Sequence, residues 1–183
     1  VTPGSGFIVE VAGKTVLDLT DAATKIQCKM RGHWPAADIE FDPIQLNETD
    51  TVTVKLHAFS PVIPHKYEVS GLPIVFFRVE VRHSGPKEGP DIGGAGVKFR
   101  WKPKESVENP QRVAIEDDVP ELTGVMLPVP GGSYAVGAPG RPFNTRAWTA
   151  SDGALEVDSS DGLKRNQAVS FTFALAWHFP EWT

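Results

Sequence analysis

The segment from Val52 to His83, VTVKLHAFSPVIPHKYEVSGLPIVFFRVEVRH, decides the fold of this chain. Apolar and polar residues alternate from Val52 to Ala58, which is the period-two pattern of a strand with one buried face. The later part, Ile74 to Val81, is rich in Val, Ile and Phe and predicts a long, deeply buried strand. The segment therefore predicts two strands with a connection between them.

The connection contains Pro61, Pro64 and Pro73. Each proline fixes φ and removes a backbone donor, so the connection cannot be a tight hairpin. We expect a stiff loop that passes the end of a sheet, and such loops often carry functional side chains. The polar residues that this loop would present are Ser60, His65, Lys66, Tyr67 and Glu68.

The composition is that of one folded domain rich in strands and turns. A chain of 183 residues buries roughly 70% of its unfolded surface. The 16 Pro and 17 Gly, against only two Met, are typical of many short strands separated by turns. The net charge of −5 indicates no basic face, so nucleic acid is not an expected partner.

Strand patterns continue on both sides of the central segment. Gly6 to Val11 and Thr15 to Leu19 predict a hairpin with Gly13 at its turn, and Ala168 to Trp177 predicts the last long strand. The other predicted strands are Lys25 to Met30, Ala37 to Phe41, Ala95 to Trp101, Leu122 to Leu127, Ser133 to Gly137, Asn144 to Thr149 and Ala154 to Val157. About a dozen short strands predict an all-β fold, an antiparallel β-sandwich. With no internal repeat or low-complexity linker, we assign residues 1–183 to a single domain.

No residue pattern for catalysis or metal binding stands out. The only cysteine, Cys28, excludes an internal disulfide and a multi-cysteine zinc site, and its strand-like surroundings predict a buried, inert thiol. The five histidines lack metal-ligand spacing, and we expect His57 and His83 to face solvent. The run from Gly93 to Gly96 is interpreted as a turn and not as a phosphate-binding loop. We therefore expect no cofactor and no metal ion.

The carboxylates lie mostly in turns or on polar strand faces, where solvated charge is the expected role. They are Asp38, Glu40, Asp42, Glu116, Asp117, Asp118, Glu121, Asp152, Glu156, Asp158 and Asp161. A glycosidase needs two carboxyl groups that flank the bond it cleaves. Nothing in the spacing of these residues selects such a pair.

Tryptophans are the more informative aromatic residues, because exposed rings can stack on sugars in binding sandwiches. Trp34 and Trp148 lie near predicted loops and are candidates for contact with a ligand or a partner. Trp101 alternates with apolar neighbours and is expected in the core, and Trp177 is expected in the core or at an interface.

The sequence contains no run near 18 consecutive apolar residues, so no transmembrane span is expected. The first residues lack the features of a signal peptide. The single cysteine and the missing signal slightly favour a soluble, cytoplasmic protein, but the compartment stays open.

Three phrases of the sequence carry a family resemblance. The first runs from Ala58 to Pro73 and contains AFSPVIP and SGLP, the second is FTFALAWHFP from Phe171 to Pro180, and the third is Trp34-Pro35-Ala36-Ala37. In their order and spacing along the chain, the three phrases resemble the N-terminal domain of the bile-acid β-glucosidase family, which includes non-lysosomal glucosylceramidase and is glycoside hydrolase family 116.

The resemblance implies the non-catalytic N-terminal part of a retaining β-glucosidase. In that family the catalytic Glu and Asp belong to an (α/α)6 barrel that follows the sandwich, so we assign no catalytic residue to this chain. The barrel would be the partner of this domain, and a β-glucoside or a glucosylceramide-like glycolipid would be the substrate of the parent. The resemblance places the domain interface at Ser60, Pro64, His65, Tyr67, Trp177, His178 and Trp182.

Two alternatives remain open. A free-standing carbohydrate-binding module would use Trp34 and Trp148 as its sugar platform. A structural or adhesive sandwich without a ligand would leave the family-like phrases as coincidence.

Overall fold

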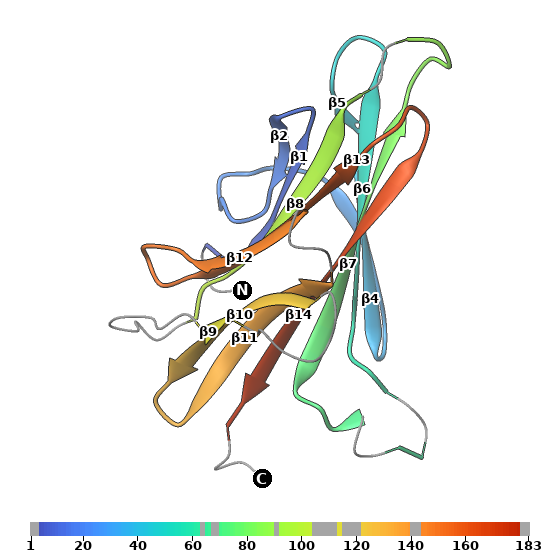
Figure 1. The fold of residues 1–183 in the computed structure, drawn as a ribbon. Helices are drawn as coiled ribbons and strands as arrows, with labels where there is room; N and C mark the ends of the chain where they lie inside the picture. The colour runs from blue at the N-terminus through green and yellow to red at the C-terminus, as the bar shows by residue number, and fades with distance from the viewer. Residues whose placement is uncertain are drawn as a thin grey trace.

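The structure is a computed structural model that describes residues 4–62, 65–66, 70–89, 92–103, 113–114, 122–139 and 144–179. Two antiparallel sheets pack face to face as a β-sandwich, as the sequence predicts (Figure 1). The smaller sheet has the order β12-β13-β8-β1-β2. Its strands are β1 (Gly6–Val11), β2 (Lys14–Asp18), β8 (Gly94–Trp101), β12 (Thr145–Thr149) and β13 (Leu155–Gly162).

The larger sheet has the order β3-β4-β6-β7-β14-β11-β10-β9, and β5 pairs with β6 beside this path. Its strands are β3 (Cys28–His33), β4 (Ala36–Phe41), β5 (Ile44–Gln45), β6 (Thr51–Phe59), β7 (Ile74–Ser84), β9 (Val113–Ala114), β10 (Leu122–Val129), β11 (Gly132–Pro139) and β14 (Ala168–His178). The two strands predicted from the central segment, β6 and β7, are therefore neighbours in the middle of this sheet. No described helix is long and apolar enough to cross a membrane.

The core lies between the two sheets and is built from the apolar positions that alternate along the strands. Val54 on β6 and Val79 on β7 are 1% exposed, and Val97 on β8 of the smaller sheet, also 1% exposed, belongs to the same core cluster. Aromatic rings fill the centre, where Phe7 stacks on Phe99 with ring centroids 4.8 Å apart and Phe173 lies 5.9 Å from Phe7. The period-two pattern thus correctly predicts which residues are buried.

Two predictions about single residues are wrong, each for a local reason. Cys28 is exposed, because β3 is the edge strand of the larger sheet and all six of its residues are exposed. His83 is buried at 1% exposure. It shares the inward-facing parity of Val79 and Val81 on β7, and its ring nitrogens find hydrogen-bond partners inside the protein.

The glycine-rich run near residue 94 also differs from the prediction. Gly94 to Gly96 form the start of β8 instead of a turn, and only Gly93 keeps the positive φ, +96°, that favours glycine. Gly96 pairs with Glu10 of β1 on one side and with Ser160 of β13 on the other. Gly94 and Gly96 therefore lie in the middle of a sheet and do not form a ligand-binding loop.

Phe173→Ala tests whether the aromatic centre carries the packing. Phe173 is fully buried, so we expect the free energy of unfolding to fall by about 3–5 kcal/mol. The neighbouring Thr172 lies on the opposite face of β14 and is partly exposed, so Thr172→Ala should change stability by only about 0.5 kcal/mol. Urea unfolding followed by fluorescence measures both. Similar losses in the two variants would contradict the assignment of the core.

Candidate functional site

Three separate segments meet at one end of the sandwich, which we call the tryptophan end. They are the β3–β4 turn at Trp34 and Pro35, the described parts of the β6–β7 connection, and the end of β14 at residues 177–179. The amide of Ser60 donates to the carbonyl of Pro35 at 3.2 Å, and the amide of Trp177 donates to the carbonyl of Pro73 at 3.0 Å. Backbone hydrogen bonds therefore fix the connection to both of its neighbours. Figure 1 shows β14 ending on the same side as the start of β7.

Large apolar side chains are exposed at the tryptophan end. Trp34 is 84% exposed, Leu72 is 53% exposed and Trp177 is 38% exposed. Beside Trp34 lies an open hollow of about 590 Å³ whose lining includes Ser60 and Val75. Contiguous exposed apolar surface is a common feature of interaction sites, so this end is a candidate site.

The structure brings several of the predicted site residues together here. Ser60 lines the same hollow as Trp34. His65 is exposed with a φ of +64°, and His178 is exposed opposite Ser133 of β11. Trp177 lies opposite Tyr134 of β11 and extends the inward-facing row of β14 past the core. The remaining predicted interface residues, Pro64, Tyr67 and Trp182, lie outside the described residues.

Trp148 lies elsewhere, on the outer face of the smaller sheet. It belongs to β12 and pairs with Glu156 of β13. The ammonium of Lys98 sits 5.2 Å from the centroid of the indole ring. This cation–π contact occupies a ring face that a sugar would need. Trp34 and Trp148 therefore do not form one platform.

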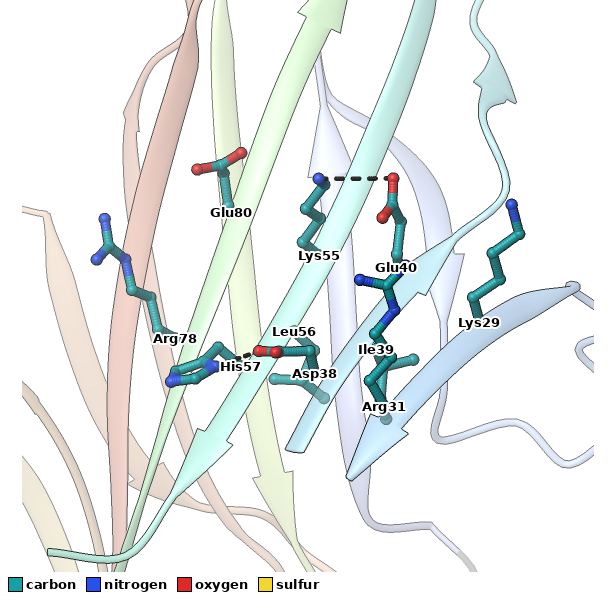
Figure 2. A pocket seen from close by; sticks show the side chains of 10 residues that line it. All are labelled: Lys29, Arg31, Asp38, Ile39, Glu40, Lys55, Leu56, His57, Arg78 and Glu80. Carbon is teal, nitrogen blue, oxygen red and sulfur yellow. Dashed lines mark hydrogen bonds and ion pairs between the residues drawn. The ribbon is translucent and has the colours of Figure 1, made fainter. Parts of the chain in front are cut away.

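A second hollow, of about 370 Å³, lies on the outer face of the larger sheet over β3, β4, β6 and β7 (Figure 2). Charged side chains line it together with Ile39 and Leu56, and each of its carboxylates has a basic partner. Asp38 bonds to His57 through its Oδ1 and the ring Nδ1, and Glu40 pairs with Lys55 at 3.5 Å. The hydrogen bond from His57 holds the pKa of Asp38 below its ordinary value. The sequence did not reveal this hollow, because it depends on the register between strands.

The buried charges belong to a different place and act as structural links. Asp50 accepts a hydrogen bond from Nε2 of His83 at 3.0 Å and pairs with Arg165 at 2.9 Å. The amide of Asn166 donates to Nδ1 of His83 at 3.1 Å, so Nε2 is the nitrogen that carries the proton. Hydrogen bonding, first from Asn47, holds the pKa of Asp50 below its ordinary value. The cluster ties the start of β6, the end of β7 and the loop before β14 together.

A second charged cluster lies on the smaller sheet. Glu156 is only 7% exposed, which contradicts the expectation of solvated charge, and it pairs with Arg100. Arg100 also pairs with Asp152, whose pKa falls to about 2, chiefly through a hydrogen bond from Lys102 at 3.0 Å. Because the two carboxylates share one guanidinium, neither suits the role of a glycosidase acid. Within the described residues, no group of three or more potential ligands could hold a metal ion.

A β-sandwich with an exposed apolar end is the class of domain that these observations define. The family comparison is more specific, because residues 8–89 match the model described as beta-glucosidase 2, glycosyl-hydrolase family 116 N-term. This match to the N-terminal domain of glycosyl-hydrolase family 116 confirms the resemblance found in the sequence, over the 82 residues from 8 to 89. Against curated proteins, the chain finds no match.

The comparison with solved structures finds matches at low sequence identity, and the first of them shares the fold. A protein described as a kojibiose phosphorylase from the human microbiome aligns with a TM-score of 0.56 and 9% identity, over 94% of this chain and 21% of that one. Heparan sulfate lyase HepC from Pedobacter heparinus gives 0.49 and 10%, over 94% of this chain and 24% of its own. A galactose mutarotase related enzyme from Lactobacillus acidophilus gives 0.37 and 9%, over 83% and 71%. The chain spans about a fifth of the length of the phosphorylase that it matches.

Asp50→Asn tests whether the buried cluster is structural. Since the pKa of Asp50 is lowered by folding, its stabilising contribution is complete above the unfolded pKa of about 3.9 and is lost as the pH falls through the folded value. We expect the variant to unfold at lower urea than the parent at pH 7, with the gap closing below about pH 4. The exposed Asp42→Asn is the matched control and should follow the parent. A gap that stays constant down to pH 2.5 would exclude this role for the carboxylate.

Proposed function

We propose that this domain is the non-catalytic N-terminal part of a larger retaining β-glucosidase and that its tryptophan end packs against the catalytic domain. The single observation that supports the proposal most is the exposure of Trp34, Leu72 and Trp177 at one end. The family match over residues 8–89 supplies the class of enzyme. The parent would act on β-glucosides, with glucosylceramide-like glycolipids as candidate substrates.

Continuity of the chain supports this end as the docking surface. The last described strand, β14, reaches the tryptophan end and is bonded there to the β6–β7 connection through Trp177 and Pro73. A domain that continues from β14 would therefore be tethered beside the exposed side chains. Covering Trp34 and Leu72 would remove from water the apolar area that now faces it. This tethering supports the catalytic barrel as the proposed partner of the surface.

The charge distribution of the described residues favours a structural role for this domain over a catalytic one. Asp50 and Glu156 are the buried carboxylates, and each pairs with an arginine. A retaining mechanism needs a carboxylate nucleophile and a second carboxyl group that donates a proton, placed about 5 Å apart across an open cleft. The carboxylates that line the hollow over β3 to β7 are likewise engaged with basic partners.

The first test is an activity assay of the 183-residue chain with an aryl β-glucoside. We expect no turnover above the heated control, because the catalytic pair would belong to the barrel. Heat-labile release of the aryl group by this chain would contradict the proposal directly.

The second test introduces the double variant Trp34→Ala, Leu72→Ala into both the native polypeptide and the 183-residue chain, and compares the loss of stability in the two. If the tryptophan end is an interface, the variant should lower the stability of the native polypeptide by about 2 kcal/mol, as removal of buried anchor residues does. The same change should cost the isolated chain less than about 0.5 kcal/mol, because both side chains are then exposed.

Met30→Ala is the matched control for this comparison. Met30 is 67% exposed and apolar, and it lies on the edge strand β3 four residues before Trp34, outside the lining of the hollow at the tryptophan end. We expect it to have the same small effect in both polypeptides. Equal effects of the double variant in the two polypeptides would show that Trp34 and Leu72 are not buried by a partner.

A further inference from the structure

The strand register arranges the outer face of the larger sheet into rows of side chains. Residues that pair across antiparallel strands share one face, and the next row on that face lies two residues further along each strand. The first polar row is Lys29, Glu40, Lys55 and Glu80. The second polar row is Arg31, Asp38, His57 and Arg78. The third row is His33, Ala36, Phe59, Phe76 and Ala174, so a strip that is apolar from Ala36 onward borders the polar rows directly.

The polar rows form the wall of the 370 Å³ hollow in Figure 2. Four basic and three acidic side chains alternate there, which disfavours a ligand of either charge. A free anion would face Asp38, Glu40 and Glu80, and a free cation would face the lysines and arginines. A neutral ligand with many hydroxyl groups fits better, because each hydroxyl both donates to a carboxylate and accepts from a guanidinium or ammonium group.

Several groups in the wall retain hydrogen-bonding capacity. Arg31 and Lys29 make no ion pair within the part of the chain that the structure describes. Arg78 donates to the hydroxyl of Ser170 at 3.3 Å and is one of the residues that line the hollow. Asp38 fixes the ring of His57 through Nδ1, so Nε2 points away from Asp38 and makes no hydrogen bond to a described residue. The hollow is therefore lined by hydrogen-bond donors and by Nε2 of His57, which donates or accepts according to the tautomer of the ring.

The apolar strip provides the second requirement for binding a sugar. The rings of Phe59 and Phe76 stack with centroids 5.4 Å apart and an interplanar angle of 24°. The ring of His57 continues the strip, 5.4 Å from Phe59. Both phenylalanines are partly exposed on the sheet surface. A sugar ring has an apolar C–H face and a polar rim, and a strip of rings beside alternating donors and acceptors matches both.

We propose that the outer face of β3, β4, β6 and β7 is a binding site for a neutral oligosaccharide. The C–H faces of the sugar rings pack on Phe59 and Phe76, and the hydroxyl groups bond to His57, Asp38 and Arg78. This site lies on the sheet surface and uses neither Trp34 nor Trp148. It requires no catalytic activity of the chain, so it stands independently of the docking role of the tryptophan end.

The test is isothermal titration calorimetry of the 183-residue chain with defined probes. Cellohexaose, laminarihexaose and soluble mixed-linkage β-glucan are the neutral probes, chosen because the matched family is described as a β-glucosidase family. Inorganic phosphate and polygalacturonate are the anionic probes. We expect saturable binding of at least one neutral probe and none of the anionic ones. Failure of every neutral probe to bind, or preferential binding of an anionic probe, overturns the proposal.

Single variants test whether the oligosaccharide binds on this face. Arg78→Ala and His57→Ala should each weaken the affinity by about tenfold or more, the loss expected for a hydrogen bond to a charged or polar group. Phe76→Leu keeps an apolar side chain but removes the ring, and it should also weaken binding. Arg146→Ala is the control, because Arg146 is an exposed arginine on the smaller sheet.

The same variants can also show that the oligosaccharide binds elsewhere on the protein. Unchanged affinity in Arg78→Ala and His57→Ala, with loss in Trp148→Ala, would overturn the assignment to the larger sheet and move the site to the smaller one. Far-ultraviolet circular dichroism of each variant tests whether a loss of affinity reflects unfolding. The docking proposal is tested separately in the native polypeptide, so the two can fail independently.

Discussion

The antiparallel pairing of β6 with β7 sets the position of the surfaces described on the larger sheet. The pairing runs without a break from Thr51 opposite Ser84 to Phe59 opposite Phe76. A slip by one residue would turn every side chain of one strand to the other face. Val54 opposite Val81 fixes the register, because both are buried against the smaller sheet. The polar rows, the ring strip and the start of the β6–β7 connection then follow from that register.

Local sequence pattern was enough to predict the fold class and the position of most strands, because it directly encodes the alternation of buried and exposed side chains. The central segment gave both β6 and β7, and its prolines correctly excluded a tight hairpin. Cys28 could not be placed correctly, since its burial depends on β3 lying at the edge of a sheet. His83 was predictable from its parity with Val81, but its polar side chain argued for solvent. Its burial depends on Asp50, a residue 33 positions away.

The candidate sites were only partly visible in the sequence. The sequence indicates Trp34 as a ligand or partner contact and Ser60 as an interface residue, without relating the two. The structure places both at one hollow through the hydrogen bond between Ser60 and Pro35. Trp148 was selected for the same chemistry, but the lysine on its ring is contributed by another strand. The hollow over β3 to β7 was missed because its residues look like ordinary polar strand positions. Only the pairing of four strands reveals that donors, acceptors and aromatic rings lie together.

The tryptophan end and the ring strip are adjacent but have different chemistry. The first is apolar and lies where β14 ends, which suits a permanent contact with a following domain. The second is bordered by alternating charges, which suits reversible contact with a polar ligand. Phe59 lies at their boundary, since it lines the hollow beside Trp34 and also stacks on Phe76. A single sandwich could in this way support a catalytic domain and hold a sugar beside it.

Amide hydrogen exchange, measured on the native polypeptide and on the 183-residue chain, tests the central claim most directly. The account predicts that the amides of the non-proline residues in 34–36, 70–74 and 177–179 exchange more slowly in the native polypeptide, because the proposed catalytic domain would cover them. Amides of β2 and β12, on the opposite sheet, should exchange at the same rate in both. Identical exchange at the tryptophan end in the two polypeptides would contradict the claim that this surface docks a further domain.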